Sequence, residues 1–498
     1  MSSPLKKILL VLVAIALLAG VSRVQQVMNR DRLKLGITRV EPLKNAPPVL
    51  AFTTVALGGF RGLISNALWM RATDLQDEEK FFEMAQLADW ITKLEPTYSQ
   101  VWVHQAWNMA YNISVKFKDW PDRWRWVWRG IELLRDEGLV YNPNDILIFR
   151  ELGWIFQHKI GQNLDDAHLY YKQQLANQMA EVFAKKKPNL DELINPQTED
   201  QKNRARILRE KWKMDPKLMK EVNKLYGPLE WRLPEAHAIY WGFKGLRAAE
   251  QHPTKVQKED FIQLRRLIYQ SMLMSFERGT LIENPYAKAY EFAPNLDIIP
   301  KVNFAYEQAA EEDKENRDHI LKAHRNFLKD AVYFLFEAAR TNEAASWYKY
   351  LSEKYPTSNL LADLKTLPST MTYDEYAIKR VQEDVGEPDL KRVTQAVLGM
   401  IQRAYTELIL GDDERYAGYM LMARKTRSTY ESQIPKQREE QLKMPEFPEM
   451  VRIARDQMLN TENPRLPADA RAVLRSKLGM EKEKIVEKPK PAGNEQTL

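Results

Sequence analysis

Tryptophan is the residue type whose spacing most suggests a binding surface in this chain. Six tryptophans fall within 27 residues, at Trp102, Trp107, Trp120, Trp124, Trp126 and Trp128, and Trp90 and Trp154 flank them. An indole ring can anchor a partner peptide, stack on a sugar or lie at a lipid interface. It can equally fill the core between helices. At helical spacing Trp124 and Trp128 share one face, whereas Trp126 points elsewhere.

The residue types that carry most enzyme chemistry occur without the spacing that such chemistry needs. The chain has no cysteine, which excludes disulfides, thiol nucleophiles and cysteine-ligated metals. Its seven histidines form no H-E-x-x-H pair, and neither a G-x-S-x-G turn nor a phosphate-binding loop is present. His158, Asp165 and His168 could meet across a helical hairpin, but polar surface positions explain them better. We expect no catalytic residue, no metal and no cofactor, with a pair of carboxylates in a hydrolase as the open alternative.

The composition favours helices and gives no general affinity for nucleic acid. The 498 residues include 74 Lys and Arg against 68 Asp and Glu, so the formal net charge is only +6. Two basic clusters, at residues 185–187 and 204–211, have acidic residues close by, and we read them as solvated helix faces. Glycine is scarce, at 19 residues, and strong helix formers are common. The sequence therefore predicts an all-α fold without a nucleic-acid partner.

The first 30 residues are typical of an export or anchoring segment. Lys6 and Lys7 precede 14 uncharged apolar residues, 8–21, and the helical pattern continues to Met28. We expect an uncleaved signal anchor in which residues 8–28 form one transmembrane helix of the inner (cytoplasmic) membrane, with the body outside the cytoplasm. A cleaved signal peptide and a buried soluble helix are the alternatives.

From Phe60 onward apolar residues recur at helical spacing, arranged as pairs of helices. The predicted pairs are 60–75 with 79–94, 100–115 with 123–137, 145–160 with 164–184, 313–340 with 342–355, and 389–410 with 412–432. Pro96 and Pro143 close the first two pairs. No strand pattern is evident, and residues 284–301, which contain three prolines, look irregular.

The first three pairs resemble tetratricopeptide (TPR) repeats, 34-residue helical hairpins with the pattern W-x2-L-G-x2-Y, then A-x3-F, then P. The matching residues of the third pair are Phe149, Leu152, Gly153 and Phe156, followed two places late by Ala167 and Tyr171. Trp102 lies six residues after Pro96, and Phe149 lies six after Pro143, which is the family spacing. The resemblance covers residues 60–175 and recurs weakly at 320–356. It departs from the family between Pro96 and Pro143, where the second unit is longer than a repeat.

This resemblance implies a solenoid whose first helices line a concave groove. If Trp102 and Phe149 are the fourth residues of their repeats, Arg150 is a fifth residue, Trp107 and Trp154 are ninth residues, and Tyr111 and His158 are thirteenth residues. In the family, these positions face the groove. We expect these five residues to form a partner-binding groove. The alternative is that the ends of neighbouring repeats cover them.

The predicted organisation combines an anchor with two helical arrays. Its segments are 1–30 (signal anchor), 31–59 (extended apolar connector), 60–185 (TPR-like repeats), 186–232 (polar linker and helix), 233–440 (second array), 441–480 (short helices) and 481–498 (disordered tail). We expect a non-catalytic scaffold of the cell envelope that binds other proteins or peptides. The alternatives are a glycan or cell-wall binding module with tryptophan platforms, and an enzyme on an α-helical toroid.

Overall fold

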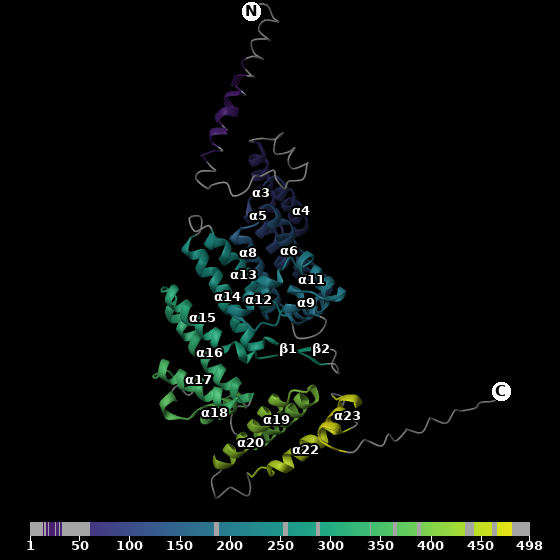
Figure 1. Ribbon diagram of the computed structural model, residues 1–498, viewed down its shortest axis with the longest axis vertical. Helices are drawn as coiled ribbons and strands as arrows, with labels where there is room; N and C mark the ends of the chain where they lie inside the picture. Colours follow the sequence, from purple (N-terminus) through teal and green to yellow (C-terminus); the bar gives the residue numbers. More distant parts are fainter. Residues whose placement is uncertain are drawn as a thin grey trace, which may run out of the picture. The chain divides into compact units, whose positions relative to one another are not determined.

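The computed structural model describes residues 60–183, 189–251, 257–284, 289–338, 340–361, 366–385, 390–433, 443–460 and 466–480, with parts of 13–31. About four fifths of these residues are helical, and one two-stranded sheet is the only strand pairing among them (Figure 1). The predicted all-α class is confirmed. Contacts divide the chain into two compact units: residues 1–155 with 247–252, and residues 156–246 with 253–498.

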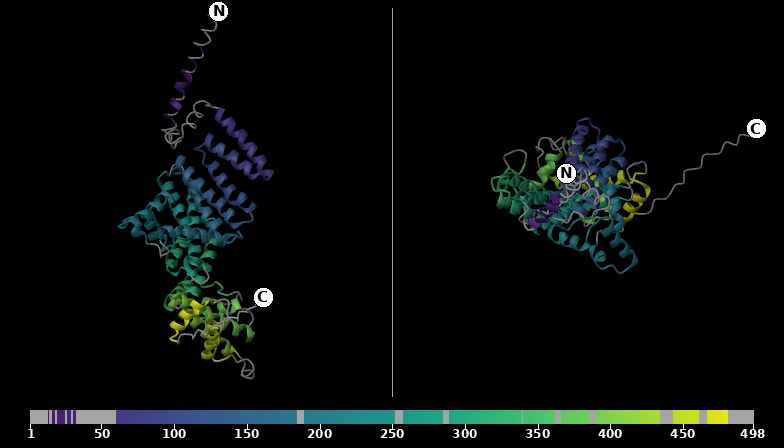
Figure 2. Two further views of the ribbon diagram at one scale, coloured as in Figure 1. Left: turned by 90° about the vertical axis from the view of Figure 1, so that its right-hand side faces the viewer. Right: turned by 90° about the horizontal axis from the view of Figure 1, so that it is seen from above.

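The first unit consists of consecutive helices that lie side by side (Figure 2). They are α3 (Phe60–Asp77), α4 (Phe81–Leu94), α5 (Ser99–Trp107), η1 (Asn108–Ile113), η2 (Ser114–Lys116), α6 (Trp120–Glu132), η3 (Leu133–Gly138), α7 (Leu139–Tyr141) and α8 (Ile146–Trp154). The π-helical segments η1 and η3 prolong α5 and α6. Helix α3 packs against α4, α4 against α5, and α5 against both α6 and α8. The helices therefore begin and end within a few residues of the predicted pairs.

The turn after α4 explains why an aromatic residue follows Pro96 at a spacing of six. The Trp102 indole Nε1 donates to the Pro96 carbonyl at 2.9 Å, and the Asn142 amide donates to the same oxygen at 2.8 Å. Trp102 is buried and stacks on Tyr141, with ring centroids 5.8 Å apart. One carbonyl thus joins the turn to the two following helices.

A close approach of α5 and α6 explains the glycine in α6. A Cβ atom added to Gly130 would lie 2.8 Å from the Ala106 carbonyl oxygen, nearer than real Cβ atoms come. The missing side chain lets the two backbones meet, and Val127 and Ile131 beside it are fully buried. This contact holds the second predicted pair together.

The described residues between 13 and 31 are helical and exposed, and they include Val13, Leu17 and Val21. Within the described part of the chain, no helix is both long enough and apolar enough to cross a membrane. The rest of the predicted anchor, the connector 31–59, the basic cluster 185–187 and the tail 481–498 lie outside the described residues.

The second unit is a longer succession of helices with one hairpin. Its elements are η4 (Ile155–Gly161, from Phe156 on), α9 (His168–Phe183), α10 (Leu190–Ile194), α11 (Glu199–Glu210), α12 (Pro216–Tyr226), α13 (Pro234–Gln251, up to Leu246), α14 (Lys258–Arg278), β1 (Thr280–Asn284), β2 (Ala289–Ala293), η6 (Leu296–Ile298), α15 (Ile299–Glu312), α16 (Arg317–Glu337), α17 (Thr341–Lys354), η7 (Pro368–Thr370), α18 (Tyr373–Val385), α19 (Leu390–Leu410), α20 (Asp413–Gln433), α22 (Phe447–Leu459) and α23 (Ala468–Lys477). Helices α19 and α20 form the predicted antiparallel pair, and Gly411 between them has a φ of 83°, which favours glycine.

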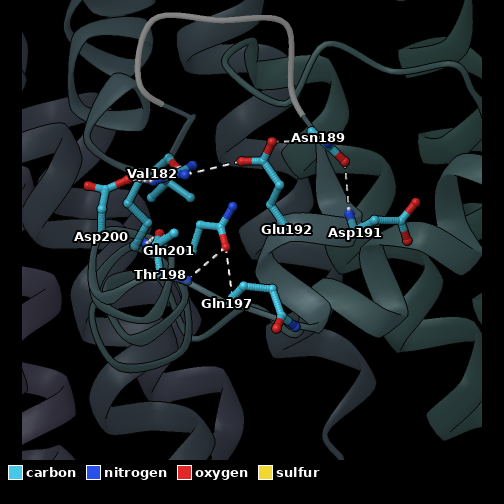
Figure 3. Close-up of polar contacts among 9 residues, drawn as sticks. Val182, Asn189, Asp191, Glu192, Gln197, Thr198, Asp200 and Gln201 are labelled. Carbon is cyan, nitrogen blue, oxygen red and sulfur yellow. Dashed lines mark hydrogen bonds and ion pairs between the residues drawn. The ribbon is translucent and has the colours of Figure 1, made fainter.

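The segment predicted as a polar linker and helix, 186–232, contains the three helices α10, α11 and α12 of the second unit. Thr198 and Gln201 form a capping box at the start of α11, with bonds of 3.2 and 3.1 Å (Figure 3). Arg204 donates to Asp200 at 2.7 Å, to Glu192 at 3.1 Å and to the Val182 carbonyl at 3.1 Å. Trp212 and Trp231 are almost completely buried. A few large anchors therefore compensate for the charged composition. The first boundary between the two compact units follows Ile155.

The β1–β2 hairpin differs from the prediction that residues near 284–301 are irregular. The strands pair antiparallel, with Leu281 opposite Phe292, and Leu281 packs with Ala176 and Leu233. Each strand has only five residues, so the alternation of apolar and polar residues is too short to be recognised beside three prolines. The pairing depends on burial against helices that lie far away in the sequence.

Candidate functional site

The first unit contains an open cavity of about 1040 Å³. Its lining residues are Gly62, Ser65, Asn66, Trp69, Glu95, Thr97, Tyr98, Gln100, Val103, His104, Trp107, Leu147 and Glu151. We call it the first-helix cavity, because α3, α5 and α8 are the first helices of the three predicted pairs, and the turn after α4 completes it. Its volume lies near the upper end of the range of about 300–1,000 Å³ that is typical of ligand pockets.

Helical periodicity explains how the sequence directs these side chains to one place. The lining residues of α3 (Gly62, Ser65, Asn66 and Trp69) and of α5 (Gln100, Val103, His104 and Trp107) both follow the spacing i, i+3, i+4, i+7. Those of α8, Leu147 and Glu151, are four apart. Each set therefore forms one stripe on its helix. The opposite stripe of α5, with Val101 and Trp102, is buried in the core.

Aromatic rings form much of the cavity wall and continue beyond it. Trp69 meets His104 edge-to-face, with ring centroids 5.4 Å apart. Trp107 stacks on Tyr111 at 5.7 Å, and a side-chain hydrogen bond joins Tyr111 to Trp154. Trp107 and Trp154 are each 38% exposed, so both rings present a face to solvent. We call Trp107, Tyr111 and Trp154 the aromatic rim.

The structure brings together most of the predicted groove residues. Trp107, Tyr111 and Trp154 form the aromatic rim, and the Arg150 guanidinium acts electrostatically on the neighbouring Glu151. Burial and the Glu151 carboxylate raise the pKa of Tyr111 above its usual range. His158 belongs to the second unit, where burial and Lys159 lower its pKa.

Glu151 is the functional candidate that the repeat positions did not identify. It is only 9% exposed, its Oε1 has no hydrogen-bond partner among the described residues, and burial raises the pKa of its carboxyl to about 7. The sequence does contain a signal for it. Glu151 lies three residues after Ile148 and four before Ile155, both fully buried, so an acid occupies the apolar stripe of α8.

The other ionisable groups among the described residues of the cavity lining are Glu95, Tyr98 and His104, so none of them carries a permanent positive charge. Burial lowers the pKa of His104, so its imidazole is neutral at neutral pH. The cavity therefore combines π-faces with carboxyl groups.

Several of the other tryptophans are packing residues, as the core interpretation predicts. Trp102 and Trp124 are buried, and Trp124 stacks on Trp128 at 5.2 Å. Trp126 points elsewhere, as predicted, and contacts Phe82 and Phe117 at 5.6 and 6.2 Å. The exposed indoles of Trp90 and Trp120 do not line the cavity.

The histidines considered as metal ligands lie near a buried ion pair. Asp165 accepts from Lys159 at 2.6 Å, from Tyr171 at 3.2 Å and from the Ala167 backbone N–H at 2.9 Å. Burial alone would raise the pKa of Asp165, but these donors, Lys159 first, hold it below its usual range. Throughout the described residues, no group of three His, Cys, Asp or Glu side chains could hold a metal ion.

Comparison with models of known protein families, with curated proteins and with solved structures gave no match to this chain. Its function therefore has to be argued from the cavity and the rim.

Proposed function

We propose that this protein is a membrane-anchored, TPR-like scaffold that binds other proteins or peptides outside the cytoplasm. The observation that carries this proposal is the first-helix cavity, built from one stripe of each of three successive first helices and bordered by the aromatic rim. Partly exposed tryptophans beside a cavity are typical of binding hot spots, where truncation of one residue costs about 2 kcal/mol or more. The proposed anchor is formed by residues 8–28, whose described part exposes its apolar side chains.

The order of the helices supports a TPR-like solenoid in the first unit. Each helix packs against its neighbours in sequence, and α5 also contacts α8, the first helix of the next pair. In a solenoid, such contacts place all first helices on one surface. The lining of the cavity by α3, α5 and α8 is the arrangement expected of a concave TPR-like groove.

The test is affinity capture from detergent-solubilised membranes, with identification of captured proteins by mass spectrometry. We expect the double variant Trp107→Ala/Trp154→Ala to lose its captured partner, because both exposed rings of the rim are removed. Trp90→Ala is the matched control, since this indole is 49% exposed and lies outside the cavity. Unchanged capture by the double variant, with helical content preserved, would exclude the groove as the binding surface.

A glycan ligand is the second candidate, because the same cavity also carries features of carbohydrate sites. Trp69 and Trp107 offer flat rings, and Glu95 and Glu151 are two carboxyl groups in one cavity. A glycosidase acid needs a raised pKa, which Glu151 has. Pull-down on peptidoglycan and chitooligosaccharides, followed by product analysis, separates this candidate from peptide binding.

A further inference from the structure

Resting on the proposed peptide-binding function, a more specific inference concerns which side chain of the partner enters the first-helix cavity. Three features of the cavity bear on it: the charges of the lining, the Glu151 oxygen that has no donor among the described residues, and the aromatic walls. Each feature lies within the first unit.

The charge of the lining favours a cation. Two carboxyl groups, Glu95 and Glu151, belong to the lining, and none of the described lining residues is a lysine or arginine. The Arg150 guanidinium, which precedes Glu151 on α8, lowers the pKa of Glu151 but is absent from the lining. The Glu151 carboxylate would repel an anionic ligand and attract a cation in this partly desolvated site.

The environment of Glu151 is incomplete in the protein alone. The Oε1 atom of Glu151 is buried and has no donor among the described residues, so it has lost hydration without gaining a hydrogen bond. Burial also raises the pKa of this carboxyl, so the group favours its neutral form until a positive charge comes near. A ligand N–H donor would complete the environment and restore the ionised form.

The walls suit the stem and the head of a basic side chain. The face of an indole attracts an ammonium or guanidinium group, and its apolar surface accommodates a methylene chain. Trp69 and Trp107 come from neighbouring first helices, α3 and α5, and both line the cavity together with Glu151. Neutral sugars would stack on the rings equally well, but they would not form an ion pair with Glu151.

We propose that the first-helix cavity binds a lysine or arginine side chain of a partner protein, with Glu151 as the carboxylate that pairs with it and Trp69 and Trp107 as its aromatic walls. The aromatic rim then holds the apolar residues that flank this basic residue. The partner segment is thus a short peptide in which one basic residue stands among apolar ones.

The test uses a randomised dodecapeptide library displayed on phage and selected on the immobilised full chain in detergent. We expect the selected peptides to share one lysine or arginine. Replacing that residue by norleucine should weaken binding about tenfold or more, because a charge-assisted pair is lost. Glu151→Gln should weaken the basic peptide to a similar degree, and the two changes together should weaken it little further.

One control variant and the pattern of outcomes separate this inference from the proposed function. Glu132→Gln on α6 changes a carboxylate outside the cavity and should leave binding unchanged. If peptides bind through Trp107 and Trp154 without a shared basic residue, or if Glu151→Gln binds the basic peptide as the parent chain does, this inference is wrong and the proposed function stands. If no peptide is selected while chitooligosaccharides bind, both are wrong.

Discussion

The two units differ in how far some of their tryptophans are exposed. In the second unit Trp212, Trp231 and Trp241 are each about 1% exposed, and their rings contact other aromatic residues of the same core. In the first unit Trp107 and Trp154 are more than a third exposed. Both units are helical, so the fold class does not explain the difference. Exposed apolar rings that lie close together are a common feature of interaction surfaces, which is why the rim carries the proposed function.

Two carboxyl groups, one from each unit, show a similar contrast. The Asp165 carboxylate of the second unit has three donors around it, whereas the Glu151 carboxyl of the first unit has one oxygen that accepts no hydrogen bond from the described residues. Satisfied groups hold a structure together, and unsatisfied ones are frequent at binding sites. Asp165 therefore uses its oxygens within the fold, and Glu151 keeps one oxygen available.

The largest expected effect compares one tryptophan from each unit. Trp231→Ala should lower the free energy of unfolding by about 3–5 kcal/mol, because it leaves a cavity in a packed core. Trp107→Ala should lower it by about 1 kcal/mol or less, because the ring is already partly hydrated. Urea unfolding of the full chain, followed by circular dichroism, measures both. Equal losses would remove the distinction between a packing and a binding tryptophan.

A somewhat smaller loss is expected when the satisfied carboxyl is neutralised. Asp165→Asn should cost about 3 kcal/mol at pH 7, because Lys159 is left buried beside a neutral group. The pKa of Asp165 is lowered to about 2 in the folded state, so its contribution is present above the unfolded pKa of about 3.9 and is lost as the pH falls through the folded-state pKa. The variant and the parent chain should therefore converge in urea titrations only near pH 1. A difference that persists there would mean that the ion pair is not its source.

The smallest effect has the opposite sign. The pKa of Glu151 is raised to about 7, so the folded state favours the protonated carboxyl, and stability falls as the pH rises from about 4.5 to 7. Glu151→Gln removes this penalty and should raise the free energy of unfolding by about 1–3 kcal/mol at pH 8, with no gain at pH 4. Thermal unfolding at both pH values measures the gain. A loss of stability at pH 8 would show that the parent carboxylate is already satisfied.

The sequence predicts the first unit well because its evidence is local. Stripes at helical spacing and prolines after each pair locate α3 to α8 within a few residues, and the spacing of Trp107 and Tyr111 already places them on one face. The burial of Trp212 and Trp231 and the β1–β2 hairpin were missed, because they depend on contacts with residues that are distant in sequence. The chemistry of Glu151 was missed for the same reason. An acid in an apolar stripe can be recognised from spacing, but its unpartnered oxygen depends on three other segments.

The shared carbonyl of Pro96 has a consequence for how quickly the site can work. Its neighbours Glu95 and Thr97 line the cavity, while Trp102 and Asn142 both donate to it from the following helices. The turn is therefore already ordered in the protein alone, and this part of the cavity wall needs no ordering when a ligand binds. For the proposed partner peptide, we expect the association rate to depend on collision and orientation and the dissociation rate to distinguish strong partners from weak ones.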